Sequence, residues 1–428
     1  MLRDTLVHLK EGAHELRLAT PTTRSKMLGV LADSIQAHIP LLIEENAKDY
    51  ADHSRSLEPA LAQRLKLSEE KLLTLVDGLR ELERAEDPLG RILARTELDD
   101  GLVLDKVSVP LGVFCVIFES RPDVFYQVLG LALRTGNGVV LKGGREATLT
   151  NRAMLNVARE ALTQHALPAS WFSLIEGRES VEELLKHDDL VDLVIPRGSN
   201  EFVRHIQGTS RIPVLGHASG VCHLYVHSSA ELDRALPIII DAKTQYPAAC
   251  NSVETILVDA QIAPTFLPRL QEELVRAGVS VRGCAESATQ LKNIDLVREN
   301  EWSTEYGSLV VAIKVVADMN EAVTHINRFG SHHTDGILAT DSAACEHFAA
   351  AVDSASVFAN CSTRFADGYR FGFGAEIGIG TGKIHARGPV GMEGILTYKY
   401  ILRGHGQIVA TYSGANARKF SFKQLPVK

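Results

Sequence analysis

The sequence predicts an α/β protein with two doubly wound, parallel-sheet domains in series and a small additional β element. Three observations predict this class. The first ~90 residues have the apolar periodicity of amphipathic helices. Short apolar runs then alternate with helical segments as far as residue 359, which is typical of parallel sheets. The 428 residues also exceed the ~100–200 residues of an average domain, so two or three domains are expected.

The first series of strands is expected after a break at Asp87-Pro88. From residue 93 to 109, apolar and polar residues alternate around Asp99-Asp100-Gly101, which predicts a β-hairpin. The short apolar runs that follow predict strands at 113–118, 138–142, 171–175 and 190–195. Helical spacing predicts helices at 123–134, 145–163, 180–187 and 200–207.

A second alternating series follows the first. Its expected strands are 253–258, 308–316, 336–339 and 356–359, and its expected helices are 262–277, 320–329 and 343–352. Beyond residue 404 the apolar periodicity is weak until Phe420. Two α/β series predict one domain for a cofactor and one for catalysis.

Composition excludes several classes of function. A net charge of −8 does not suit nucleic-acid binding, which needs a basic face. No run approaches the ~18 apolar residues of a membrane span, and the first 19 residues lack the apolar centre of a signal peptide. The six cysteines lack CxxC spacing and nearby histidine pairs, so neither disulfides nor a metal site is expected. We therefore expect a cytoplasmic protein in which a thiolate is available for chemistry.

Cys250 is the first candidate for that chemistry. It follows an apolar helix at 236–242 and precedes Asn251 and Ser252. Backbone N–H groups at such a junction would stabilise a thiolate or an oxyanion. The alternative is a buried apolar cysteine, which is the commoner case. Cys115 and Cys222 lie in apolar runs and are assigned to the core.

A turn rich in glycine, Lys142-Gly143-Gly144-Arg145, follows one expected strand and opens a helix. Glycine lets the backbone approach a ligand, and a helix N-terminus favours an anion. Lys142 would reach ribose hydroxyls, and Arg145 would pair with a 2′-phosphate. The alternative is a plain strand-to-helix turn with solvated charges.

Two further segments are candidates of the same kind. Gly198-Ser199 lies between a strand and a helix, where it suits a diphosphate, although Ser199 taken singly is better interpreted as a helix N-cap. The glycine-rich run 371–381 predicts a tightly turned loop. Such loops line active sites or serve as structural turns.

Together these segments resemble the aldehyde dehydrogenase superfamily over nearly the whole chain. The resemblance is carried by Pro110-Leu111-Gly112-Val113, Leu133-Arg134-Thr135-Gly136-Asn137, Lys142, Gly198-Ser199 and Cys250, about fifty residues further on. Longer strings resemble the gamma-glutamyl phosphate reductase family within it. These strings lie at 45–49, 116–123, 241–247, 302–307, 333–335 and 360–365.

The resemblance implies an aldehyde dehydrogenase-like fold with two Rossmann-like domains and a small β oligomerisation element. The implied cofactor-binding domain spans 1–93 and 111–216, and the implied catalytic domain spans 217–390. The oligomerisation element would comprise 94–110 and 391–412, followed by a C-terminal tail at 413–428. Because an exposed strand edge should be paired, a homo-oligomer is expected.

The resemblance also implies NADPH as the cofactor. Lys142, Gly143, Gly144 and Arg145 match the adenosine ribose site, and the cation at Arg145 favours NADPH because many NAD-using relatives carry a carboxylate there. Gly198 and Ser199 match the diphosphate turn. Glu305 matches the carboxylate that holds the nicotinamide ribose, and Phe373 of the glycine-rich loop is expected at the cofactor as well.

The implied reaction is reduction of L-glutamyl 5-phosphate to L-glutamate 5-semialdehyde through a thioester on Cys250. The backbone N–H of Cys250, with Asn251, is the expected oxyanion donor. Hydrolytic relatives carry a glutamate before a Leu-Gly-Gly run, whereas Val214 stands at that position here. Valine cannot act as a general base, so the expected acyl partner is phosphate, although coenzyme A is also compatible.

Substrate recognition is expected from two further segments. Ser362, Thr363 and Arg364 offer two hydroxyls and a guanidinium for a carboxylate. Arg121 is a candidate for the phosphate or carboxylate and Asp123 for the ammonium group. The alternatives are a surface ion pair for Arg364 and a helix N-cap for Asp123. The resemblance implies a separate glutamate 5-kinase as the supplier of substrate, while a non-catalytic relative stays open as a third interpretation.

Overall fold

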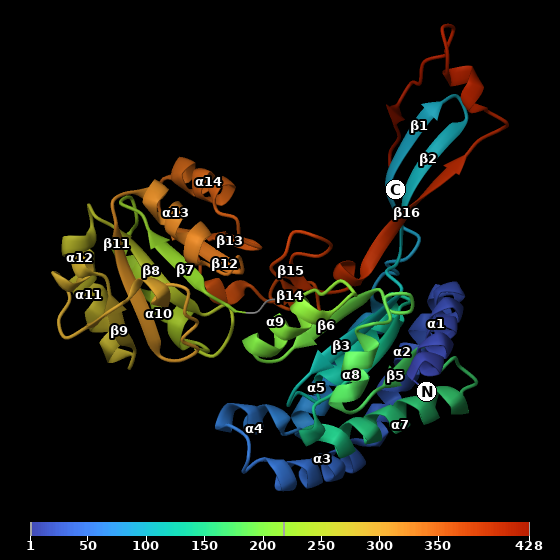
Figure 1. The fold of residues 1–428 in the computed structure, drawn as a ribbon, viewed down its shortest axis with the longest axis horizontal. Coiled ribbons are helices and arrows are strands. Elements are labelled where there is room, and N and C mark those ends of the chain that lie inside the picture. The colour runs from blue at the N-terminus through green and yellow to red at the C-terminus, as the bar shows by residue number, and fades with distance from the viewer. Residues whose placement is uncertain (1, 217–218, 428) are drawn as a thin grey trace. The chain divides into compact units, whose positions relative to one another are not determined.

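The computed structural model describes residues 2–216 and 219–427, apart from the side chains at positions 59 and 60. It forms two compact units. The first comprises Met1–Gly198, Thr209–Val214 and Gly391–Lys428, and the second comprises Ser199–Gly208 and Leu215–Val390. Figure 1 labels the elements of both units.

Five helices open the first unit, as the periodicity predicts. They are α1 (Leu2–Leu18), α2 (Pro21–Ala37), α3 (Ile39–His53), α4 (Pro59–Leu65) and α5 (Glu69–Arg84). In α5, Leu72, Leu75 and Leu79 are buried at the i, i+3, i+7 spacing of one helical face. The hydroxyl of Ser68 accepts the backbone N–H of Lys71 and so caps its first turn.

The first parallel sheet follows these helices and has the order β5-β4-β3-β6. Its strands are β3 (Val113–Phe118), β4 (Gly138–Lys142), β5 (Phe172–Leu174) and β6 (Leu193–Arg197), and its helices are α6 (Val124–Arg134), α7 (Thr148–Gln164) and α8 (Arg178–Leu184). Every residue of β3 is buried, as expected for a parallel strand covered on both faces. The order reverses between β3 and β6, so a ligand crevice is expected at the carboxyl ends of these strands.

One prediction for this unit is wrong in detail. The expected single helix at 145–163 is divided into the 3₁₀ turn η1 (Arg145–Ala147) and α7. At the junction, Ala147 has φ −124° and ψ 27°, which are not helical values. The break leaves Arg145 on the short turn rather than inside a long helix.

A four-stranded antiparallel sheet completes the first unit, in the order β16-β2-β1-β17. It contains the predicted hairpin, β1 (Ile92–Asp99) and β2 (Leu102–Pro110), with β16 (Leu396–Arg403) and β17 (Lys423–Gln424) on either side. Asp105 is buried and accepts hydrogen bonds from Arg95 (2.6 and 2.9 Å) and Arg403 (2.5 Å). Asn137 links the residue before β3 of the parallel sheet to the residue before β16 of the antiparallel sheet. Its Oδ1 accepts Gly112 N and its Nδ2 donates to Ile395 O, each at 2.8 Å.

The second unit holds a seven-stranded parallel sheet in the order β10-β9-β11-β8-β7-β12-β13. The strands are β7 (Cys222–Val226), β8 (Val253–Asp259), β9 (Ser280–Gly283), β10 (Asp295–Leu296), β11 (Val310–Val316), β12 (Thr334–Leu338) and β13 (Ser356–Ala359). The helices are α9 (Asn200–Thr209), α10 (Leu232–Thr244), α11 (Ala263–Arg276), α12 (Ala285–Ala288), α13 (Met319–Phe329) and α14 (Ser342–Ala351).

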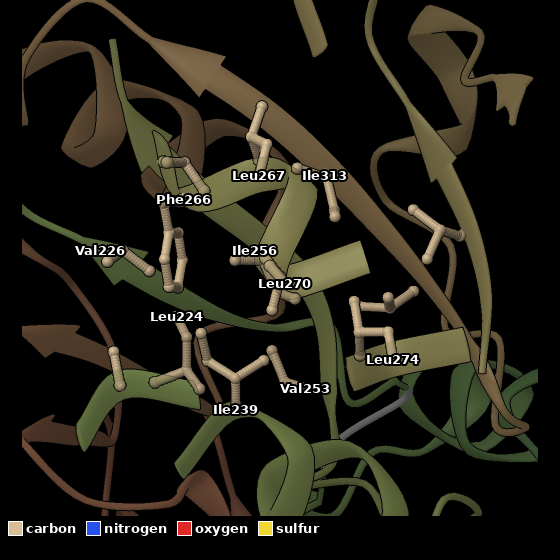
Figure 2. Close-up of a cluster of buried hydrophobic side chains, with 14 of the residues drawn as sticks. Leu224, Val226, Ile239, Val253, Ile256, Phe266, Leu267, Leu270, Leu274 and Ile313 are labelled. Carbon is tan, nitrogen blue, oxygen red and sulfur yellow. The ribbon is translucent and has the colours of Figure 1, made fainter. Parts of the chain in front are cut away.

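Helices cover both faces of this sheet. On one face, Leu224 and Ile256 of the sheet pack against Ile239 of α10 and Phe266 and Leu270 of α11 (Figure 2). On the other face, a second buried cluster joins the sheet to α13 and α14; it includes Tyr225, Leu257, Ile326 and Phe348. The expected doubly wound arrangement is therefore present.

The order of the strands determines which loops meet. β8 and β12 both pair with β7, and all three strands are parallel. In this register Cys222 lies opposite Val253, and His223 lies opposite Asp335. The segments that enter β8 and β12 therefore lie at the same amino-terminal edge of the sheet.

No single helix within the described ranges has both the length and the apolar character needed to cross a membrane, whereas the bent pair α2–α3 meets that test by length and composition alone.

Candidate active site

Cys250 lies in the tight turn that joins α10 to β8. Ala249 N bonds Tyr246 O (3.1 Å), and Ser252 N bonds Ala249 O (2.8 Å). Cys250 is partly exposed and forms no disulfide. Its own carbonyl accepts the S–H of Cys222 at 3.2 Å. A Cβ at Gly220 would lie 2.0 Å from that carbonyl oxygen, so close packing at this turn requires glycine.

His333 contacts the sulfur of Cys250. The distance from His333 Nε2 to Cys250 Sγ is 3.2 Å, and Nδ1 of the same ring lies 2.8 Å from Thr334 Oγ1. His333 directly precedes β12 and is 1% exposed. The predicted nucleophile therefore has an imidazole within hydrogen-bond distance.

The side chain of Asn251 also anchors this turn through a hydrogen bond. Its Nδ2 donates to Ala366 O (2.8 Å), and the residue is 4% exposed. One of its two amide hydrogens is thus used by the protein, while Oδ1 has no hydrogen-bond partner among the described residues. The expected oxyanion role of Asn251 stays a prediction.

Arg364 lies near this turn, in η3 (Thr363–Phe365). Its Nε donates to Gln245 Oε1 (2.9 Å), and its guanidinium lies 5.8 Å from the centre of the Tyr246 ring. The pKa of Arg364 lies below its ordinary value because the residue is buried. The negative charge of a Cys250 thiolate acts in the opposite direction. The alternative interpretation of Arg364 as a surface ion pair is wrong, because the residue is only 9% exposed.

The hydroxyl residues beside Arg364 differ from each other. Ser362 Oγ accepts Arg364 N (3.3 Å) and caps η3. Thr363 is fully buried, and its Oγ1 has no hydrogen-bond partner within the described part of the chain. Leaving a buried hydroxyl unpaired is unfavourable, so Thr363 is the better candidate to meet a ligand.

A buried ion pair supports the strand after Cys250. Lys243 Nζ lies 2.8 Å from Glu254 Oε2 and donates also to Val253 O (3.0 Å). Burial raises the pKa of Glu254 to about 7 and lowers that of Lys243, while the contact between them opposes both shifts. Glu254 Oε1 accepts Gly307 N (3.3 Å), which fixes the segment that carries Glu305. Glu305 in turn accepts Nδ2 of Asn200 (3.1 Å).

A cavity of about 420 Å³ lies in the first unit, by the carboxyl ends of β4 and β5. Four of its lining residues are those predicted at the adenosine ribose: Lys142, Gly143, Gly144 and Arg145. Other charged residues also line the cavity: Glu119, Glu146, Glu176 and Arg178. Burial, and then the neighbouring Glu146, raise the pKa of Glu119. Basic groups and exposed backbone suit the phosphate and ribose of a dinucleotide.

Asn151 of α7 also lines this cavity and was missed from the sequence. It is 2% exposed, and its Oδ1 has no hydrogen-bond partner among the described residues. A Cβ at Gly143 would lie 2.1 Å from its Nδ2, so glycine is needed for the two segments to meet. An unpaired buried acceptor in a cavity fits a ligand that donates a hydrogen bond, such as a ribose hydroxyl or an adenine amino group.

Other predicted residues lie apart from these clusters or on the boundary of a unit. Ser199 Oγ accepts Phe202 N (3.3 Å) at the start of α9, which is the N-cap geometry, and the division between units falls between Gly198 and Ser199. Asp123 precedes α6 without a side-chain capping bond, so the alternative N-cap interpretation lacks its bond. Arg121 lies in the same loop, between β3 and α6.

The glycine-rich loop turns as predicted. Gly372 and Gly374 both have φ of 76°, a region that disfavours other residues. Phe373 is half exposed and contacts Phe371, with ring centres 5.5 Å apart. Val214 forms an isolated bridge with Val194, and His217, three residues further along the chain, lies outside the described residues.

Residues 8–291 match the family model described as "Aldehyde dehydrogenase family". The chain belongs to the aldehyde dehydrogenase family. Members of this family use a nicotinamide cofactor. The chain is 47% identical to gamma-glutamyl phosphate reductase 1 of Synechocystis sp. over 98% of both chains. It is 49% identical to gamma-glutamyl phosphate reductase of Natronomonas pharaonis, over 96% of this chain and 95% of that one.

Solved structures agree with this assignment. A crystal structure of gamma-glutamyl phosphate reductase from Thermotoga maritima has a TM-score of 0.92 and 36% identity, covering 95% of this chain and 99% of that one. An acetylating aldehyde dehydrogenase from Geobacillus thermoglucosidasius, 18% identical with a TM-score of 0.64, shares the fold. The predicted resemblance to the gamma-glutamyl phosphate reductases within the aldehyde dehydrogenase family is confirmed.

Two residues of this aldehyde dehydrogenase family member gave little sequence signal. His333 was recognised only as part of a matching string, 83 residues from Cys250. Asn151 lies in a helix whose periodicity indicates an ordinary amphipathic face. The one signal for it in the sequence is an asparagine at the start of the helix that follows the Gly143-Gly144 segment.

Proposed function

We propose that this chain reduces L-glutamyl 5-phosphate to L-glutamate 5-semialdehyde and phosphate, with NADPH as reductant and through a thioester on Cys250. This is a step of proline biosynthesis from glutamate. The observation that carries the proposal is 47–49% identity to gamma-glutamyl phosphate reductases over at least 96% of the chain. The arrangement of Cys250, His333 and Arg364 supports it, because it places a thiol beside an imidazole and near a cation that suits an anionic substrate.

In the mechanism, the sulfur of Cys250 attacks the 5-carbonyl carbon, and the bond from that carbon to the phosphate oxygen breaks. The backbone N–H of Cys250 is the donor that we assign to the developing oxyanion. When bound, NADPH supplies the hydride that reduces the thioester carbon. The carbon–sulfur bond then breaks, which releases the aldehyde and returns Cys250 to its starting state.

Substrate selection falls to the residues near Arg364. A guanidinium with one N–H engaged by Gln245 still has four N–H groups with which to bind a carboxylate. Thr363 Oγ1, buried and without a partner among the described residues, is a second group for the same carboxylate. Roles for Ser362, Arg121 and Asp123 in binding the phosphate and ammonium groups belong to the same proposal.

The preference for NADPH is argued from the charged cavity of the first unit. Lys142 and Arg145 supply positive charge for a 2′-phosphate, and Asn151 supplies an acceptor for a hydroxyl or amino group. Glu305, Ser199, Gly198 and Phe373 are assigned to the remainder of the cofactor on the family resemblance.

The reverse reaction tests the proposal most directly. With glutamate 5-semialdehyde and NADP, we expect reduction of NADP that depends on inorganic phosphate. Reduction that requires coenzyme A instead of phosphate, or that proceeds with water alone, would contradict the proposed substrate. Cys250→Ala should abolish the reaction, and the matched change Cys361→Ala, in the loop before η3, should leave most of it.

We further propose a homo-oligomer in the cytoplasm, with a glutamate 5-kinase as the source of the acyl phosphate. All six cysteines are free, which suits a reducing compartment. The antiparallel sheet β16-β2-β1-β17 is the proposed contact between copies. An acyl phosphate is labile, so rapid transfer from the protein that makes it would limit its hydrolysis.

A further inference from the structure

We propose that His333 is the catalytic base of this site: its Nε2 takes the proton of the Cys250 thiol and delivers it to the departing phosphate. The inference rests on the proposed function, since it names a group for that same reaction. It adds a residue to the mechanism, because the sequence pattern gave His333 no role.

The contact has the geometry of a nucleophile and its base. Nε2 of His333 and Sγ of Cys250 are 3.2 Å apart, within the distance of an S–H···N hydrogen bond. Cys250 is partly exposed and can meet a substrate, whereas His333 is 1% exposed. A substrate can therefore reach Cys250 while its sulfur is in contact with the imidazole.

The imidazole is itself held in one orientation. With Nδ1–H donating to Thr334 Oγ1 (2.8 Å), Nε2 carries the lone pair that faces the sulfur. The backbone is fixed as well, because Ser356 N donates to His333 O (3.0 Å) and Ala355 N donates to His332 O (2.9 Å). A nucleophile, a base and a group that orients the base form the pattern expected of an activated cysteine.

A thiol and a guanidinium lie near the contact. Cys222 on β7 donates its S–H to Cys250 O, and burial raises the pKa of Cys222 well above its ordinary value. It therefore stays protonated and does not compete for the proton. Arg364 on η3 interacts electrostatically with Cys250, which places a positive charge near the sulfur.

The neighbouring carboxylates already have partners. Glu254 on β8 is paired with Lys243 at 2.8 Å. Asp335 on β12 accepts both His223 N and His223 Nδ1 at 2.8 Å. Both carboxylates are thus engaged by other side chains, and the imidazole of His333 is the base in contact with the sulfur.

The proton balance of the reaction suits this role. The Sγ–H bond breaks and Sγ–C forms, while the bond from carbon to the phosphate oxygen breaks. Without a proton the phosphate would leave as a strongly basic trianion, so transfer through Nε2 releases it as hydrogen phosphate. After reduction, the carbon–sulfur bond breaks with its electron pair on sulfur, and a proton taken up from water through Nε2 restores the thiol.

Alkylation of Cys250 by iodoacetamide, followed by mass spectrometry of its peptide, tests the inference without substrate or cofactor. We expect His333→Gln to slow the reaction at least tenfold at pH 7, because glutamine can bond the sulfur but cannot accept its proton. At pH 10 the two proteins should react at similar rates, since thiols ionise unaided above ~8.5. In the forward reaction kcat should fall about 100-fold, with little change in KM for the acyl phosphate.

The adjacent histidine supplies the matched control. His332 bonds Asp353 O instead of Cys250 and has φ of 59°, which asparagine tolerates. In the His332→Asn variant, Cys250 should therefore be alkylated at the wild-type rate. Equal alkylation rates at pH 7 for wild type and His333→Gln would overturn the inference.

A measurement on the unaltered protein covers the case in which His333→Gln does not fold. Cys250 of the wild type should react at least tenfold faster than glutathione at pH 7, and an equal rate would count against His333. Loss of phosphate dependence in the reverse reaction would refute the proposed function while leaving these alkylation rates unchanged, so the two failures are distinguishable.

Discussion

Several buried polar atoms without protein partners lie beside the residues that we assign to substrate and cofactor. They are Oδ1 of Asn151, Oδ1 of Asn251 and Oγ1 of Thr363, all unpaired among the described residues. A buried group left unpaired costs about 1–3 kcal/mol. Hydrogen bonds from a ligand would remove that cost, so the free energy of ligand binding would become more favourable by the same amount.

Asn151 provides the sharpest test of this argument. We expect Asn151→Leu to raise KM for NADPH roughly tenfold, as for the loss of one hydrogen bond of about 1.4 kcal/mol. The melting temperature should stay equal or rise, because an unsatisfied amide oxygen is removed from the interior. Steady-state kinetics and thermal unfolding measure the two effects, and an unchanged KM would show that Oδ1 does not meet the cofactor.

Recognition of the 2′-phosphate is a separate property, assigned to Arg145. Arg145→Gln should raise KM for NADPH about tenfold and leave KM for NADH nearly unchanged, because one charge-assisted hydrogen bond contributes about 1.5–3 kcal/mol. Arg152→Gln is the matched control, since Arg152 is exposed and paired with Glu176 instead. Equal effects on both cofactors would mean that Arg145 does not contact the phosphate.

At the scale of the element, α13 depends on a histidine that is buried without charge. His325 is 4% exposed and packs against Trp302 and Phe329, with ring centres 5.1 and 4.7 Å away. Burial, and then the nearby His223, lower the pKa of His325 to about 3. An exposed histidine titrates near ~6.5, so the unfolded chain binds a proton that the folded chain excludes.

This difference fixes the sign of a pH effect. The stability that neutral His325 contributes is complete above about pH 6.5 and is lost as the pH falls towards 3, by up to about 1.4 kcal/mol per pH unit. We expect the melting temperature of His325→Phe to fall less than that of the wild type when the pH is lowered from 7.5 to 5.5. An equal loss in both proteins would show that other groups control acid sensitivity.

The elements that the sequence predicted share a clear local signal. β3 and β8 are continuous apolar runs, and both are found close to their predicted bounds. β9 and β10 were missed because they are short and partly polar, and they are strands only because β11 and β9 pair with them. The contact of His333 with Cys250 depends on the order β8-β7-β12, which no local pattern contains.

At the scale of the whole molecule, the assigned roles are divided between the two units. The cavity with Lys142, Arg145 and Asn151 belongs to the first unit, whereas Cys250 and His333 belong to the second. Changes at the nucleophile should therefore leave the cavity residues of the first unit intact. This separation is the physical reason why Cys250→Ala should bind NADPH like the wild type while losing its activity.

Assembly is the remaining property of the whole molecule, and we propose that copies meet through the antiparallel sheet of the first unit. β16 is an edge strand, and alternate residues of a strand share one face. Tyr398, Tyr400 and Leu402 therefore lie on one face of β16, and each is about half exposed or more. Large exposed apolar side chains beside an unpaired edge mark a surface that is normally covered.

The double change Tyr400→Asp with Leu402→Asp should weaken this contact, because it places two charges where apolar side chains would be buried against a second copy. Sedimentation velocity should show an oligomer for the wild type and a species near 46.7 kDa for the variant. Lys399→Asp, on the opposite face of β16, is the control and should sediment like the wild type. If the wild type itself sediments as a single chain, the sheet does not join copies, and its exposed face must serve another contact.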